Sequence, residues 1–330
     1  MSAPAPTLDV IRAAHERVAP HVVRTPTVPF YGAALAEAFD GEVWLKMELL
    51  QRTGSFKARG ALNTVLALSD EERARGVAAV SAGNHAIATA WAAQQANTSC
   101  KVVMLRAANP FRVAQVERLG GTIVPGETMG ELFELYERLL EDEGRAPVHP
   151  FEGPRTFEGT AGVGLELFED APALDAVVVP VGGGGLIAGV VSAFHHLSPD
   201  TEVFGVEPER ASGMAQSLEA GAPLPKVEVS SIADSLSAPL HMPASFAIIR
   251  EHVADMVQVS EDAMRAAMRL AFTDLKLAVE PACAAGIAAL VGPLRERLGG
   301  RRVGLVLCGS NIDPQTWVRL AEIDGSSTNA

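Results

Sequence analysis

The stretch Thr53-Gly54-Ser55-Phe56-Lys57-Ala58-Arg59-Gly60 surrounds one lysine with mostly small residues and places an aromatic ring beside it. An ammonium group in a tight, mostly apolar turn loses hydration. Its pKa then falls, and its neutral amine becomes a nucleophile toward carbonyl groups. A surface lysine in a glycine-containing loop explains the same residues equally well. The stretch alone therefore leaves both interpretations open.

A second motif, far along the chain, favours the nucleophile. Val181-Gly182-Gly183-Gly184-Gly185-Leu186 follows the apolar run Ala176–Pro180 and precedes a helical pattern. A strand, a glycine loop and a helix N-terminus together bind phosphate through backbone N–H groups. An imine-forming lysine combined with a phosphate site predicts pyridoxal 5′-phosphate as the cofactor.

Apolar runs alternate with helical patterns along most of the chain, which predicts parallel sheets with crossover helices. The expected strands cover residues 42–46, 77–80, 101–105, 121–124, 176–181, 202–206, 256–259 and 302–307. The pattern restarts after His149-Pro150, so we expect two α/β units. The candidate residues follow strands, at the edge where open parallel sheets bind ligands.

Composition excludes several classes of function. The formal net charge of −13 argues against nucleic acid and anionic membranes as partners. Three cysteines, Cys100, Cys283 and Cys308, are too few and too scattered for a disulfide framework or a metal site. We therefore expect a reducing, cytoplasmic location. No signal peptide is visible, and four glycines interrupt the longest uncharged apolar stretch, so we expect no membrane span.

Five motifs, in this order, resemble the fold-type II pyridoxal-phosphate enzymes, in particular the serine/threonine dehydratases (ammonia-lyases) and the serine racemases. They are TGSFKARGALN at 53–63, SAGNHA at 81–86, PVGGGGLIAG at 180–189, SSIAD at 230–234 and LCGSNID at 307–313. The resemblance covers nearly the whole chain. It implies a tryptophan synthase β-like fold of two open, twisted, mostly parallel sheets flanked by helices, with the cofactor in the cleft between two domains.

The same resemblance implies domain boundaries and an assembly. Residues 53–150 would form the small domain. Residues 1–52 and 151–330 would form the large domain that binds the cofactor phosphate. A homodimer is the expected assembly.

The resemblance also assigns roles to residues near the cofactor. Lys57 matches the Schiff-base lysine, with Phe56 packed near the cofactor ring. Gly182, Gly183, Gly184 and Gly185 match the phosphate loop. Cys308 matches the residue that faces the pyridine nitrogen. Ser310 could take that place if the local register differs, and Cys308 could instead be a small core residue.

A third group of residues would contact the substrate. The turn Ser81-Ala82-Gly83-Asn84-His85 matches the loop that receives the substrate carboxylate on backbone N–H groups. Within it, Asn84 matches the residue that hydrogen-bonds the ring hydroxyl. Asn84 as an ordinary turn residue and His85 as a structural histidine are the alternatives.

These identities predict the reaction. A buried thiol at the pyridine nitrogen stays neutral, so negative charge at the substrate Cα is less stabilised and rapid loss of the β-substituent is favoured. Lys57, once displaced by the substrate amine, would remove the Cα proton as general base. We expect dehydration and deamination of an L-serine- or L-threonine-type amino acid to a 2-oxo acid and ammonia.

Two departures from the family pattern refine this expectation. Racemising relatives carry a serine where this chain has Ala82, which cannot hold a proton, so we expect dehydration rather than racemisation. Relatives that bind a divalent cation place an acidic residue after a strand and another six positions on. Glu207 fits the first place but Gly213 occupies the second. We therefore expect no metal, and Glu207 could be a solvated carboxylate.

Several alternatives stay open. Arg155 or Arg52 could pair with a second carboxylate, which would suit 3-hydroxyaspartate or another modified β-hydroxy amino acid. Surface exposure of both arginines is the other interpretation. A racemase or a β-replacement enzyme would share the fold. A non-catalytic phosphate-ligand binder would use the glycine loop but would have no use for a desolvated amine at Lys57.

Overall fold

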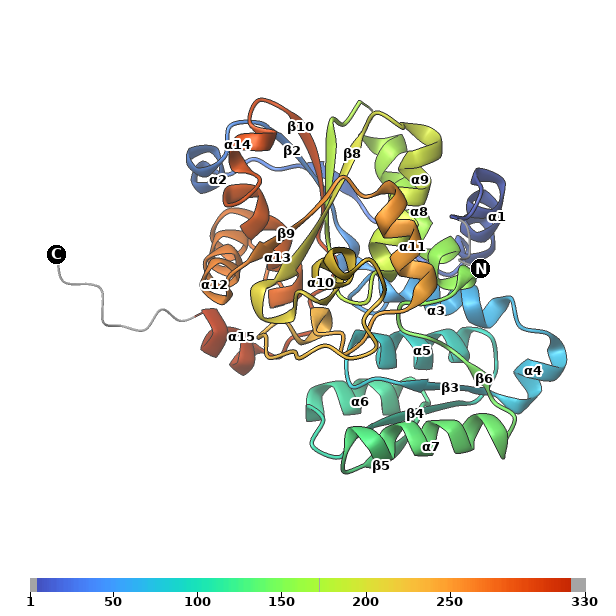
Figure 1. The fold of residues 1–330 in the computed structure, drawn as a ribbon. Coiled ribbons are helices and arrows are strands. Elements are labelled where there is room, and N and C mark those ends of the chain that lie inside the picture. The colour runs from blue at the N-terminus through green and yellow to red at the C-terminus, as the bar shows by residue number, and fades with distance from the viewer. Residues whose placement is uncertain (1–4, 172, 322–330) are drawn as a thin grey trace.

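The structure, a computed structural model, describes residues 5–171 and 173–321 and contains two sheets flanked by helices (Figure 1). The larger sheet has the strand order β1-β2-β10-β7-β8-β9 and is parallel except for β1, which pairs antiparallel with β2. Its strands are β1 (Thr27–Pro29), β2 (Glu42–Lys46), β7 (Ala176–Pro180), β8 (Glu202–Pro208), β9 (Asp255–Val259) and β10 (Arg302–Val306).

The smaller sheet is parallel throughout, in the order β5-β4-β3-β6. Its strands are β3 (Val77–Val80), β4 (Cys100–Leu105), β5 (Thr122–Gly126) and β6 (Ala146–Pro147). The prediction of two mostly parallel sheets is confirmed. Strands β1 and β6 were not predicted. Each is very short, ends in proline and lies at a sheet edge, which is where a residue without an N–H is tolerated.

Helices cover both faces of each sheet. Around the smaller sheet lie α3 (Lys57–Leu66), α4 (Asp70–Arg75), α5 (Asn84–Gln95), α6 (Pro110–Arg118) and α7 (Met129–Glu141). In β3, Val77 joins the apolar cluster beneath α5, while the next residue, Ala78, joins the cluster beneath α7. The alternation of side chains along a strand therefore supplies both layers.

The larger sheet is enclosed in the same way. The helices of this part are α1 (Leu8–Val18), α2 (Ala33–Ala38), α8 (Pro154–Asp170), α9 (Gly185–Leu197), α10 (Gly213–Ala220), α11 (Pro243–His252), α12 (Glu261–Leu270), α13 (Pro281–Val291), α14 (Arg295–Leu298) and α15 (Pro314–Ala321). Strand β7 (AVVVP) is buried along its whole length, between α9 and α13. A parallel strand that is covered on both faces has a continuous apolar sequence, which is why β7 was predictable.

Helix α3 packs against both α5 and α8, so it lies where the two sheet units meet. Beneath it lies a buried ionic network that the sequence did not predict. The Arg59 guanidinium donates to Glu48 and to Glu166 at 2.8 Å each, and Lys46 donates to Glu166 at 2.6 Å. All four side chains are fully buried. Among the described residues, no helix has the length and apolar character needed to cross a membrane.

Candidate active site

Lys57 is the first residue of α3 and is held beside the end of β10. Ser55 forms an isolated antiparallel bridge with Gly309, and the Phe56 amide donates to the Cys308 carbonyl at 3.1 Å. The Lys57 ammonium donates to the Pro150 carbonyl and lies 4.9 Å from the centroid of the Phe56 ring. Burial lowers the pKa of this amine to about 8. A neutral, nucleophilic form of Lys57 is therefore accessible near neutral pH.

The glycine loop follows β7 and leads directly into α9, as predicted. Gly184 has a φ of +95°, a conformation that favours glycine. A Cβ on Gly183 would lie 2.1 Å from the Phe151 ring, and one on Gly185 would lie 2.6 Å from the Phe151 carbonyl oxygen. The loop can follow this path only without side chains. The N–H groups of the first turn of α9 have no partners within the helix, so they can bind an anion.

An inner pocket brings these two motifs together. It is lined by Phe56, Lys57, Asn84, Gly182, Gly183, Gly184, Gly185, Glu280 and Cys308, among others. Ser310 is not among the lining residues, and its amide donates to the Gly54 carbonyl. A hydrogen bond with Cys283 and burial hold the pKa of the Cys308 thiol well above its usual range. Cys308 is therefore a neutral group in this pocket.

The turn after β3 forms the neighbouring wall. Asn84 and His85 are the first two residues of α5, and the Ser81 hydroxyl accepts the Gly83 N–H at 3.1 Å. The start of α5 therefore presents backbone N–H groups that suit a carboxylate. His85 bonds the Val148 carbonyl at 2.8 Å, and burial lowers the pKa of its imidazole to about 3. His85 is thus a neutral, buried side chain held by its neighbours.

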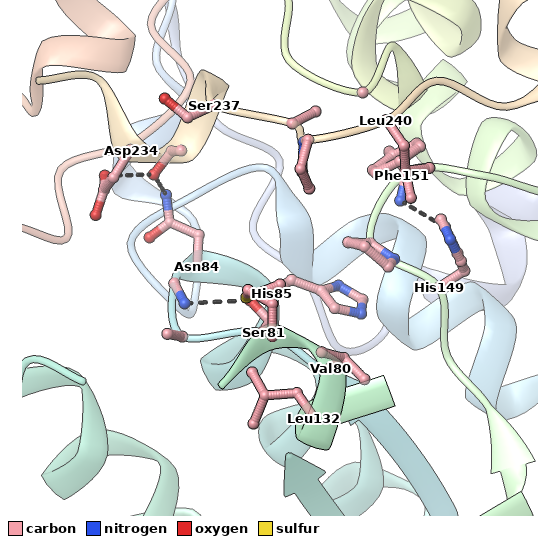
Figure 2. Close-up of a pocket in the computed structure, with 18 of the residues that line it drawn as sticks. Val80, Ser81, Asn84, His85, Leu132, His149, Phe151, Asp234, Ser237 and Leu240 are labelled. Atoms are coloured by element: carbon pink, nitrogen blue, oxygen red, sulfur yellow. Dashed lines mark hydrogen bonds between the residues drawn. The ribbon is translucent and has the colours of Figure 1, made fainter. Parts of the chain in front are cut away.

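A larger cavity of about 360 Å³ adjoins Lys57 and the turn that contains Ala82. Figure 2 shows Val80 and Leu132 at one side of it, Leu240 and Phe151 at another, and Asn84 on the side of Asp234. Most of its exposed lining is apolar. The apolar side chains come from α7, from the ends of β3 and β4, from the segment between β6 and α8, and from the loop before α11; they include Val80, Leu105, Met129, Leu132, Phe133, Tyr136, Phe151, Ala238, Pro239 and Leu240.

Comparison with known proteins decides the family. The model of a family described as "Pyridoxal-phosphate dependent enzyme" matches residues 18–309. The chain belongs to this family. Its cofactor is pyridoxal 5′-phosphate.

Individual relatives agree with the family match. This pyridoxal-phosphate dependent enzyme is 49% identical to a phenylserine dehydratase of Ralstonia pickettii, over 89% of this chain and 90% of the relative. It is 38% identical to the L-threonine ammonia-lyase of Thermotoga maritima, over 93% and 76% of the two chains. The structure of maize serine racemase superimposes with a TM-score of 0.90 at 33% identity, covering 96% of this chain and 97% of that chain.

The site fits the cofactor. Lys57 offers an amine of lowered pKa, and the glycine loop offers a helix N-terminus to the same inner pocket. The loop must remain free of side chains, as the close approach of Phe151 shows. Lys57 would hold the aldehyde carbon, and the loop would hold the phosphate. These are the two ends of the bound group.

Both arginines considered for substrate binding in this pyridoxal-phosphate dependent enzyme lie outside the cavity. Arg52 is exposed and donates to the His21 carbonyl at 3.3 Å. Arg155 is exposed as well, and its carbonyl accepts from Asn63. Neither arginine lines the cavity. The hypothesis that either one pairs with a second substrate carboxylate is therefore not supported, and the surface interpretation holds.

Glu207 is not the solvated carboxylate considered above. It is 1% exposed, and its two oxygens accept the N–H groups of Met214 and Ala215 at 2.8 Å each. Burial raises the pKa of Glu207 to about 8, and the two N–H donors oppose that rise. A Cβ on Gly213 would lie 2.4 Å from Nε2 of the buried His241. Glu207 therefore caps the start of α10.

Two parts of the site were missed from the sequence. Glu280 precedes Pro281 at the start of α13, and an acidic residue at this position is typical of an ordinary helix N-cap. Met129 and Phe133 lie on α7 outside the stripe of leucines that marks its buried face. The signal for Glu280 was its place directly before a helix with no other charged residue. We find no sequence signal for Met129 and Phe133.

Proposed function

We propose that this enzyme dehydrates and deaminates a β-hydroxy amino acid whose β-carbon carries an apolar group of about the size of a phenyl ring. The chain is a pyridoxal-phosphate-dependent dehydratase of β-hydroxy amino acids, as its relatives are. What we propose beyond this is the apolar character of the group on the substrate's β-carbon. It rests mainly on one observation, the apolar wall of the cavity next to Lys57.

The charges around the cavity support this choice. Of its lining residues, all within the described part of the chain, only Lys57 carries an ammonium or guanidinium group. His85 and His149 also line it, and burial lowers the pKa of His149 to about 4, so both are neutral at pH 7. A second substrate carboxylate would find no cationic side chain there besides Lys57. An aryl group would instead contact Leu132, Phe133 and Leu240. The phenylserine named for the Ralstonia relative carries such a group.

Different residues of the chain bind the substrate carboxylate, remove the Cα proton and tune the cofactor. Bound pyridoxal phosphate supplies an electron sink for negative charge at the substrate Cα. The N–H groups at the start of α5 bind and orient the substrate carboxylate. Lys57, whose amine has its pKa lowered to about 8, takes the proton from Cα at its Nζ atom. Cys308 stays a neutral thiol, which limits stabilisation of that negative charge and favours loss of the β-hydroxyl.

A substrate panel tests this proposal. Release of 2-oxo acid is measured with the stereoisomers of 3-phenylserine, serine, threonine and 3-hydroxyaspartate. We expect kcat/KM for one phenylserine isomer to exceed that for serine by roughly tenfold or more, because the apolar wall binds the ring. A higher value for serine or 3-hydroxyaspartate would contradict the aryl assignment.

The same panel separates the alternatives. D-Serine formed from L-serine at the rate of pyruvate would favour a racemase, and incorporation of an added thiol at the β-carbon would favour a β-replacement enzyme. A non-catalytic phosphate-ligand binder would release no 2-oxo acid. In that case, borohydride reduction would leave no cofactor attached to Lys57.

We further propose that the enzyme works as a homodimer in the reducing cytoplasm. Cys100, Cys283 and Cys308 are all buried free thiols, as suits such a compartment. Tyr31 is 84% exposed and Phe272 is 51% exposed, and such apolar surface can be covered by a second copy. Light scattering coupled to gel filtration would report a mass of twice 34.6 kDa.

A further inference from the structure

Glu280 directs its carboxylate away from the helix that it precedes. It stands at the N-cap of α13, yet its side chain makes no capping hydrogen bond. The side chain lines the inner pocket and the residue is only 2% exposed. Its Oε1 atom accepts from Nδ2 of Asn84 at 2.7 Å, and its buried Oε2 atom has no partner among the described residues. A buried carboxylate with one unpaired oxygen lowers the stability of the fold, which suggests that it is retained for a function.

A chain of hydrogen bonds fixes the direction in which the Asn84 amide points. Asn311 donates from Nδ2 to the Thr53 carbonyl at 2.7 Å, and a carbonyl can only accept. The same Nδ2 donates to Oδ1 of Asn84 at 2.8 Å. The oxygen of Asn84 is thereby engaged, so its NH₂ group must face Glu280. The carboxylate completes an arrangement with only one consistent orientation.

Gly309 leaves room for this arrangement. A Cβ at position 309 would lie 2.6 Å from Oε1 of Glu280 and 3.3 Å from Nδ2 of Asn84. Gly309 directly follows Cys308, the thiol of the inner pocket. The segment after β10 therefore accommodates the Glu280 carboxylate by carrying no side chain at this point.

The charged and titratable groups around Glu280 come from several elements. Burial and, to a smaller extent, Asp234 raise the pKa of Glu280, whereas Arg112, the hydrogen bond from Asn84 and Lys57 lower it, and together these effects place it at about 7. In return, Glu280 raises the pKa of Lys57 against the effect of burial. The Cys308 thiol is a further titratable neighbour, and Glu280 raises its pKa. Lys57 and Glu280 therefore favour each other's charged forms within one pocket.

We propose that Glu280 is a positioning residue of the cofactor site, which holds the Asn84 amide with its N–H groups toward the pocket and stabilises positive charge on the Lys57 nitrogen. This role concerns the cofactor and the lysine, and it does not depend on which amino acid is the substrate. A failed substrate panel would therefore leave it standing.

The test uses the rate at which pyridoxal phosphate recombines with apoprotein, followed by visible absorbance across pH. The neutral Lys57 amine is the reacting form, so the rate rises with pH up to a plateau, and the midpoint reports its pKa. Glu280→Gln keeps the shape of the side chain and removes its charge. We expect its midpoint to lie about one pH unit below that of the wild type.

Glu207→Gln is the matched control, because Glu207 is an equally buried carboxylate that only caps α10. Its midpoint should equal that of the wild type. Equal midpoints for Glu280→Gln and the wild type would overturn the proposal. If Glu280→Gln does not fold, Gly309→Ala displaces the carboxylate without removing it and should shift the midpoint in the same direction. An unshifted midpoint in a folded Gly309→Ala protein would also overturn the proposal.

A double-mutant cycle tests whether Glu280 acts on cofactor binding through Asn84 or independently of it. Cofactor dissociation constants are compared for Asn84→Ala, Glu280→Ala and the double variant. If Glu280 acts through Asn84, each single change weakens binding about tenfold and the second adds little to the first. Strictly additive losses would contradict action through Asn84.

Discussion

Nζ of Lys46 lies 2.6 Å from Oε2 of Glu166, and neither side chain has any exposed surface. Glu166 also accepts from Arg59, which stands two residues after Lys57 on α3. The helix that begins with the reactive lysine is thus tied to α8 by buried charges. Removing Glu166 would leave the buried Lys46 ammonium without its nearest carboxylate and would leave Arg59 with Glu48 as its remaining carboxylate in this network.

Glu166→Ala should therefore lower the free energy of unfolding by about 3–5 kcal/mol. Urea denaturation followed by circular dichroism measures the loss. The control is Glu127→Ala, because Glu127 and its partner Arg106 are both exposed, at 62% and 64%. That change should cost less than about 1 kcal/mol. Equal losses in the two variants would contradict the assigned role of the network.

Lys57 should titrate well below an ordinary lysine. Burial lowers the pKa of its amine to about 8, and only the neutral amine attacks an aldehyde. Recombination of cofactor with wild-type apoprotein should therefore slow as pH falls below about 8 and should level off above it. Lys57→Ala should show neither covalent attachment nor 2-oxo acid release. A midpoint near 10.5 would mean that the amine is solvated.

Phe133 should contribute to substrate choice. It lines the cavity while 43% of its surface is exposed, so its ring is available to an aryl substrate. Phe133→Ala should lower kcat/KM for phenylserine about tenfold and leave that for serine nearly unchanged. Phe111→Ala provides the control, because Phe111 is 40% exposed but lies on α6 and outside the cavity lining. An equal effect in both variants would point to a general loss of stability.

Chelators should leave the activity intact. Both oxygens of Glu207 are engaged by backbone N–H groups of α10, and no cluster of three or more metal-ligating side chains occurs among the described residues. The enzyme dialysed against excess EDTA should keep its rate and its thermal midpoint. A loss that magnesium or calcium restores would show that a cation displaces this helix cap.

Ala82 should suppress racemisation. It lines the cavity beside the start of α5, and its methyl group cannot carry a proton. Wild-type enzyme given L-serine should therefore form pyruvate without comparable D-serine, as chiral chromatography would show. Ala82→Ser introduces a hydroxyl at that wall and should increase the D-serine to pyruvate ratio. An unchanged ratio would mean that the hydroxyl does not reach the substrate Cα.

Much of the architecture could be predicted because parallel strands leave a simple signature. The run at Ala176–Pro180 is apolar throughout, and the glycines after it mark a turn into a helix. Lys57 and the Gly182–Gly185 loop were recognised for the same reason, since each has a local composition that matches its chemistry. The structure places both in one pocket.

What escaped prediction depends on contacts between distant segments. Glu280 and Asn84 are 196 positions apart, so the contact that gives this carboxylate its place in the pocket cannot be inferred from the residues near it in the sequence. The same holds for Lys46 and Glu166, which are separated by 120 positions. Helical periodicity marks only the face of α7 that packs on its own sheet. Leu132 and Tyr136 belong to that stripe and also line the cavity, whereas Met129 and Phe133 line the cavity from outside it.

The part of the apolar wall that α7 supplies is separate from the elements that line the inner pocket. Met129, Leu132 and Phe133 belong to α7, which packs on the smaller sheet, whereas the glycine loop and Cys308 follow strands of the larger one. Substitutions on one helix can thus alter which amino acid is accepted while the bond-breaking groups stay unchanged. Related enzymes would thus differ in substrate specificity through substitutions confined to α7.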